Sequence, residues 1–207
     1  MTKNKISSSF HLACVFLILI TFVLFSCAGQ NKEKEAPVTI EKDKVSQTIP
    51  EPELSLLPSA GNGEAEKVKE LLEKGADVNE KDADGRTALM YASFNGYSEV
   101  VNELLKHNAD VNLTDINGRS ALMFAASGPF HETVKILLEK NAEPNIRDNQ
   151  EHFTAFMFAA AEGQLENIKV LLEFGANPNL KDIDGDNALT FAKNNEHQEV
   201  VEYLQNL

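Results

Sequence analysis

A pattern that returns every 33 or 34 residues constrains the fold of this chain more than any other feature. The clearest repeats share one alanine at the same place: Ala88, Ala121, Ala155 and Ala188. A leucine pair follows the same spacing, at residues 71–72, 104–105, 137–138 and 171–172. A fixed period of this length predicts a stack of small units, each of which buries its apolar side chains against its neighbours.

Each repeat carries the signals for a turn followed by two helices. The turn pattern Asp-x-Asp/Asn-Gly occurs at residues 82–85, 115–118 and 182–185, and its glycine supplies a positive φ. A side-chain oxygen then stands at the expected N-cap of the first helix, on Thr87, Ser120, Thr154 and Asn187. The second helix has apolar residues spaced for one helical face and is expected to end at Gly75, Asn108, Asn141 and Gly175. The predicted fold class is therefore all-α.

The array is predicted to span residues 54–207 and to hold about five repeats. Their expected bounds are 54–81, 82–114, 115–147, 148–181 and 182–207, with the first and last acting as caps. Pro58 stands where Tyr91 stands one repeat later, so the first helix of the first repeat should be short. Pro129 replaces the glycine between the helices of the third repeat, and the turn at 148–154 has one extra residue and no glycine.

These repeats resemble the ankyrin repeat, through the motifs D-x-x-G-x-T-x-L-x-x-A-A, G-x-x-E-V-V-x-x-L-L and G-A-D-V-N. The resemblance implies a solenoid that binds another protein on its concave face, through the turn tips and the exposed side of the first helices. The residues at those positions are Asp84, Arg86, Phe94, Asn95, Asn117, Arg119, Ser127, His152, Phe153, Glu162, Asp184, Asp186 and Asn194.

Two pairs among these residues suggest how a partner is held. Phe94 and Phe153 are apolar at positions that are often polar, so they are candidate anchors. Arg86 and Arg119 occupy equivalent turn positions and are expected to pair either with a carboxylate of the partner or with nearby aspartates of the array. A further stripe of Met and aromatic residues at repeat spacing, at 90–91, 123–124, 157–158 and 191, is interpreted as core between repeats.

The N-terminus has the layout of a secretory signal over residues 1–26. Lys3 and Lys5 precede an apolar run that ends near Phe25. The sequence Leu-Phe-Ser-Cys at 24–27 resembles a bacterial lipobox, which implies that Cys27 is lipidated and anchors the chain to a membrane of the cell envelope. Ala28, where many inner-membrane lipoproteins carry Asp, favours the outer membrane, with the array in the periplasm or at the cell surface. An uncleaved anchor helix is the alternative, although the run is short for a span.

Residues 27–53 are rich in Lys, Glu and Pro and contain no aromatic residue. Such a stretch buries too little apolar surface to offset the entropic cost of ordering, so it is predicted to be a disordered tether.

Charge and composition exclude several classes of function. The formal net charge of −13 disfavours binding to nucleic acid. No cysteine follows Cys27, the histidines are scattered, and the Asp-rich run at 182–186 lacks the spacing of a calcium loop. No catalytic constellation is found, so we expect no enzyme activity, no cofactor, no metal and no small-molecule substrate.

The sequence predicts a protein-binding module with an unknown protein partner. The alternatives are an accessory that stabilises an envelope enzyme, or an enzyme with an unrecognised site.

Overall fold

The computed structural model describes residues 54–207, which form ten helices and no strand. The predicted signal at 1–26, the lipidation of Cys27 and the tether at 27–53 lie outside the described residues. The first helices of the repeats are α2 (Leu57–Gly61), α4 (Ala88–Phe94), α6 (Ala121–Ala126), α8 (Ala155–Ala161) and α10 (Ala188–Asn194). The second helices are α3 (Ala65–Glu73), α5 (Ser98–Lys106), α7 (His131–Glu139), α9 (Leu165–Glu173) and α11 (Gln198–Gln205).

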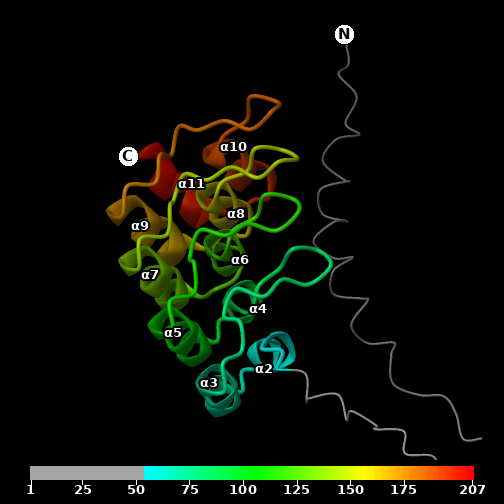
Figure 1. Ribbon diagram of the computed structural model, residues 1–207. Coiled ribbons are helices and arrows are strands. Elements are labelled where there is room, and N and C mark those ends of the chain that lie inside the picture. Colours follow the sequence, from blue (N-terminus) through cyan, green and yellow to red (C-terminus); the bar gives the residue numbers. More distant parts are fainter. Residues whose placement is uncertain (1–53) are drawn as a thin grey trace, which may run out of the picture. The chain divides into compact units, whose positions relative to one another are not determined.

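The helices form two rows that run side by side along the array (Figure 1). Each first helix packs on the first helix of the next repeat and on the second helix of its own repeat. The turns between repeats project beyond the row of first helices. This arrangement confirms the predicted all-α solenoid.

The predicted helix boundaries have the expected hydrogen bonds. Each N-cap side chain accepts a bond from the backbone N–H three residues later, over 3.1–3.4 Å, at Thr87, Ser120, Thr154 and Asn187. Each second helix from the first to the fourth repeat is followed by a residue of positive φ, at Gly75, Asn108, Asn141 and Gly175. Glycine adopts this conformation without strain, and asparagine tolerates it better than most residues do.

The irregular repeats are accommodated locally. Helix α2 has only five residues and contains Pro58 in its first turn, as predicted. In the turn at 148–154, His152 takes the positive φ of 61° that glycine supplies in the other turns. The Asp148 carboxylate accepts bonds from the backbone N–H groups of Glu151 and Phe153, both over 3.0 Å, and these bonds hold the longer turn.

Small and thioether side chains fill the space between repeats. Ala92, Ala125, Ala159 and Ala192 are fully buried, and Met90, Met123 and Met157 are at most 2% exposed. The aromatic members of the predicted core stripe differ, because Tyr91, Phe124, Phe158 and Phe191 are only half-buried. The interpretation as core is confirmed for the methionines, whereas Phe124, Phe158 and Phe191 pack against the core and remain partly exposed.

The third repeat lacks one backbone hydrogen bond of its loop, and a side chain of the fourth repeat replaces it. In the second repeat, the Gly96 N–H donates to the Ser93 carbonyl over 3.2 Å. Pro129 stands at the equivalent position and has no N–H, so the Ala126 carbonyl lacks that donor. Asn167 of helix α9, which is 1% exposed, donates its side-chain amide to the carbonyls of Ala126 and Gly128, over 3.1 and 2.7 Å.

Candidate protein-binding surface

The exposed side of the first helices, together with the turn tips, is called here the first-helix face. A row of aromatic rings at equivalent positions runs along it: Tyr91 (α4), Phe124 (α6), Phe158 (α8) and Phe191 (α10). Phe94, 39% exposed, packs edge-on against Phe124 at 6.2 Å between ring centroids. The sequence interpretation missed this row as a surface, although the signal was present. An aromatic residue stands next to the invariably small alanine in four repeats.

Phe153 lies between two rings of this row. Its centroid is 5.4 Å from that of Phe158 and 4.7 Å from that of Phe191. Phe153 is half-buried and packs against the core, so it is less exposed than its interpretation as a free anchor implied. The three rings form one apolar cluster, called here the aromatic trio, across the fourth and fifth repeats.

Tyr91 is fixed by a hydrogen bond from its hydroxyl to the Asp82 carboxylate, over 2.6 Å. Burial, followed by this bond, raises the pKa of Tyr91. Burial alone would also raise the pKa of Asp82. The bonds that its carboxylate accepts from the Tyr91 hydroxyl and from the turn backbone outweigh burial, and the pKa of Asp82 is lowered. The Asp82 carboxylate therefore stays ionised and the Tyr91 hydroxyl stays protonated. Their hydrogen bond holds the Tyr91 ring in place at the N-terminal end of the row.

The two turn arginines are paired within the array. Arg119 lies 3.1 Å from the Asp115 carboxylate, which is fully buried, and its guanidinium lies 5.1 Å above the centre of the Phe124 ring. Arg86 lies 3.8 Å from Asp84, close to the limit of an ion pair. Of the two roles that the sequence left open, the structure places both arginines beside aspartates of their own turns.

Apart from Glu162, the remaining predicted residues divide into two groups. Asn95 donates to the carbonyls of Gly61 and Tyr91, Asn117 accepts a bond from Gln150, and the Ser127 hydroxyl donates to the Phe124 carbonyl. Bonds of this kind position the scaffold and leave less of each side chain for a partner. The more available side chains are the exposed Asp84, His152, Asp184 and Asn194 and the half-exposed Asp186.

A family model for ankyrin repeats in three copies matches residues 56–148 and again residues 122–207. The chain belongs to the ankyrin-repeat family. No curated protein matches the chain. Ankyrin repeats form a protein-interaction module, in which stacked repeats present an extended surface.

One predicted contact residue of the ankyrin array, Glu162, is not freely exposed. It caps the C-terminal end of helix α8 and is half-buried, and this burial raises the pKa of its carboxyl, while His197 opposes the shift. The prediction of Glu162 as a contact residue rests on the ankyrin resemblance, which implies binding by the exposed side of the first helices. The opposing His197 comes from the following repeat, which the sequence pattern of one repeat does not show.

Replacing Glu162 with glutamine is expected to raise the melting temperature at pH 7. The raised pKa means that ionised Glu162 costs stability above the pKa of the folded state. Below the ordinary glutamate value of 4.5 the carboxyl is protonated in both states, so the cost is absent there. Melting temperatures of parent and variant, measured from pH 4 to pH 8, should diverge as the pH rises. The exposed Glu132→Gln control should show no such gain, and a constant or opposite difference for Glu162→Gln would contradict the assignment.

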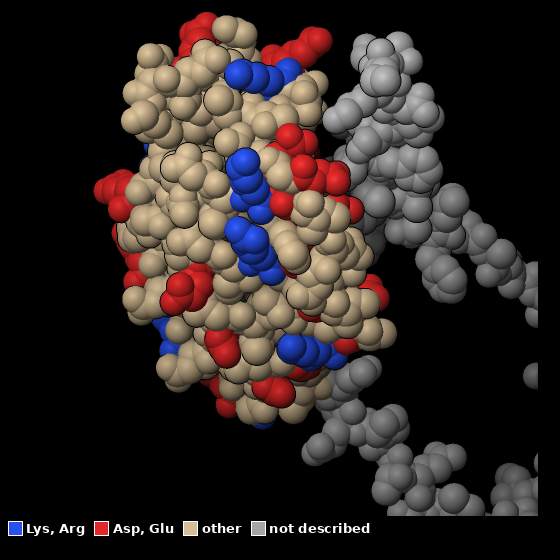
Figure 2. Space-filling model, turned by 90° about the horizontal axis from the view of Figure 1, so that it is seen from above, with Lys and Arg blue, Asp and Glu red and all other residues tan. Residues whose placement is uncertain are grey.

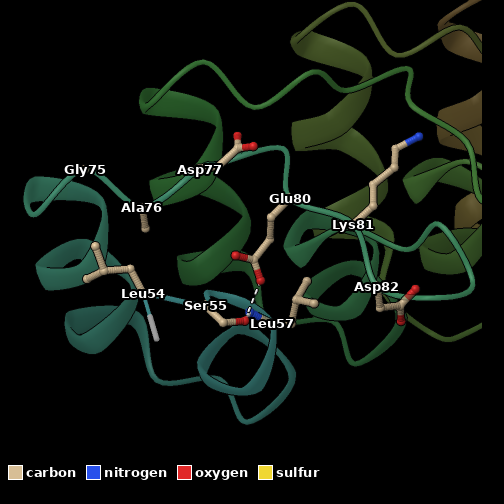
Figure 3. A pocket seen from close by; sticks show the side chains of 9 residues that line it. All are labelled: Leu54, Ser55, Leu57, Gly75, Ala76, Asp77, Glu80, Lys81 and Asp82. Atoms are coloured by element: carbon tan, nitrogen blue, oxygen red, sulfur yellow. Dashed lines mark hydrogen bonds between the residues drawn. The ribbon is translucent and has the colours of Figure 1, made fainter. Parts of the chain in front are cut away.

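A hollow of about 520 Å³ lies beside the first ankyrin repeat (Figure 3). It is lined by Leu54, Ser55, Leu57, Gly75, Ala76, Asp77, Glu80, Lys81 and Asp82. Most of its polar groups already have partners. The Ser55 hydroxyl donates to Glu80, the Lys81 ammonium donates to the Thr114 carbonyl, and Asp82 binds Tyr91. The described residues contain no group of His, Cys, Asp and Glu that could hold a metal ion.

Charge is mixed over the surface of the array. On the face drawn in Figure 2, basic side chains lie in a short line flanked by acidic ones and form no broad basic patch. This face therefore lacks the continuous positive surface that nucleic-acid binding requires. Within residues 54–207, no helix is long and apolar enough to cross a membrane.

Proposed function

We propose that this ankyrin-repeat chain is a non-catalytic binding module that captures a partner protein on its first-helix face and is held at a bacterial envelope membrane by lipid on Cys27. The aromatic row carries the first half of the proposal. Large rings that a repeat array leaves half-exposed, on a rigid row of helices, are suited to bury apolar side chains of a partner. The N-terminal sequence pattern alone supports the lipid anchor.

Photo-crosslinking in intact cells tests the binding face. A photoreactive amino acid in place of Phe94 is expected to form an adduct with a discrete protein. The same amino acid in place of Asn102 (α5) or Lys135 (α7), on the second-helix surface, should form none. Adducts from positions 102 and 135 without one from position 94 would show that binding uses the opposite surface.

Metabolic labelling tests the anchor. Cells that express the full chain and receive a palmitate analogue are expected to tag it. Cys27→Ser should abolish the tag, whereas Cys14→Ser should keep it, because Cys14 lies within the apolar run. A chain that stays untagged, or that keeps its tag without Cys27, would exclude lipidation at this residue.

A further inference from the structure

One turn position forms a row whose charge changes sign along the ankyrin array. The residue before the first-helix N-cap is, in successive repeats, Arg86, Arg119, Phe153 and Asp186. Each of these residues donates its backbone N–H to the aspartate that opens its turn, over 2.7–3.0 Å. The four positions are therefore structurally equivalent.

Backbone hydrogen bonds fix these turns to one another. Each link joins an N–H of one turn to a carbonyl of the preceding turn: Ile116 to Asp84 over 3.0 Å, Asn149 to Asn117 over 2.8 Å and Ile183 to Glu151 over 3.1 Å. Because the turns are joined at each step, the four side chains lie in a fixed order along one edge of the first-helix face.

Charge is compensated at one end of this row and uncompensated at the other. Arg86 and Arg119 have aspartate partners in their own turns. Among the described residues, Glu151, Asp184 and Asp186 form no ion pair. Lys193 is the one Lys or Arg of the fifth repeat, which holds six acidic residues at 182, 184, 186, 196, 199 and 202. The C-terminal end of the row is therefore negative.

The uncompensated carboxylates lie in the turn next to the aromatic trio. Phe153 precedes Asp186 in the row and contacts Phe158 and Phe191. An apolar cluster beside free carboxylates is complementary to an apolar side chain flanked by cations. The rings supply apolar area that a partner can bury. Asp184 is exposed and Asp186 half-exposed, so their carboxylates contribute orientation and association rate more than affinity.

We propose that the trio and the adjoining carboxylates of Asp184 and Asp186 bind a protein segment in which a large apolar side chain is flanked by Lys or Arg. The segment lies with its apolar side chain on the trio and its cations toward the turn of the fifth repeat. This inference rests on the proposed function, because it names the chemistry of the partner on the same face.

Short peptides test the inference with the full chain. The probe is fluorescein-labelled Gly-Ser-Lys-Leu-Phe-Lys-Ser-Gly, and its binding is followed by fluorescence anisotropy. One comparison peptide replaces both Lys with Glu, and another replaces Leu-Phe with Ser-Ser. Both are expected to bind at least about tenfold more weakly, because one loses charge complementarity and the other loses apolar area. Equal binding of either comparison peptide would overturn the inference.

Paired variants locate the site. Asp184→Asn with Asp186→Asn should weaken probe binding about three- to tenfold, the effect of losing two solvent-accessible ion pairs. The control, Glu99→Gln with Glu132→Gln, removes the same charge from exposed positions on α5 and α7 and should leave binding unchanged. An equal loss in the control would show that only overall charge acts, and would overturn the inference.

Two further outcomes separate this inference from its premise. If position 94 crosslinks a partner while the Glu peptide binds as well as the Lys peptide, the proposed function stands and the partner chemistry is wrong. If crosslinks arise only from positions 102 and 135, the proposed function itself is wrong. Stabilisation of the array by Ca²⁺ alone, lost in the double Asn variant, would assign the carboxylates to a metal ion and overturn the inference.

Discussion

Replacing Phe156 with alanine is expected to lower the free energy of unfolding by about 3–5 kcal/mol, the range for large cavities left by aromatic truncation. Phe156 is 1% exposed and is the largest fully buried side chain among residues 54–207. It lies in α8, which packs against both α6 and α10, so its loss loosens two interfaces between repeats at once. Urea denaturation followed by circular dichroism measures the effect.

Phe156→Leu is the matched control. Leucine occupies the equivalent positions 89 and 122, where it is also buried, so the surrounding packing is suited to it. This variant should lose much less stability than Phe156→Ala. Equal losses for the two variants, or a loss below about 1 kcal/mol for alanine, would contradict the placement of Phe156 at the centre of the core.

Replacing Asn167 with valine is expected to destabilise the array although valine occupies the equivalent positions 100 and 200. The change removes the side-chain donor to the Ala126 and Gly128 carbonyls. The Gly128 carbonyl keeps a bond from the Phe130 N–H, but the Ala126 carbonyl is left without its donor. An orphaned buried carbonyl costs about 1–3 kcal/mol, and the lost bond to Gly128 adds about 0.5–1.5 kcal/mol.

A double-mutant cycle with Pro129→Gly isolates the cause. Glycine restores an N–H at the position from which Gly96 bonds to the Ser93 carbonyl. In that background the Ala126 carbonyl regains a donor, so Asn167→Val should cost less than it does in the parent. Additive effects of the two changes would show that Asn167 does not compensate for Pro129.

The repeats, the helix N-caps and the helix ends could be predicted from the sequence, because each depends on residues close together in the chain. Thr87 bonds to an N–H three residues away, and Asn108 ends its helix by its own backbone conformation. The period then fixes which units are neighbours. The same local logic gave the short helix around Pro58.

Features that depend on the neighbouring repeat were not predictable in the same way. Glu162 is half-buried and interacts with His197 of the fifth repeat, and Phe153 packs on rings from α8 and α10.

Asn167 stands where the second and fifth repeats have Val100 and Val200, whereas the first and third repeats have Lys67 and Thr133. Its side chain bonds to the carbonyls of Gly128 and Ala126, which lie 39 and 41 residues earlier in the chain and next to Pro129. Only the contact seen in the structure shows that Asn167 and Pro129 are related.

Contacts between neighbouring repeats also determine how the array can fold during translation. The side-chain hydrogen bonds that join different repeats of the described array connect residues only 29 to 41 positions apart. A repeat leaving the ribosome therefore finds its partner already synthesised and needs nothing from the far end of the chain. During translation, only the most recently synthesised repeat exposes apolar surface that a later repeat will bury. The array can thus grow during translation with little surface exposed to aggregation, one helix pair at a time.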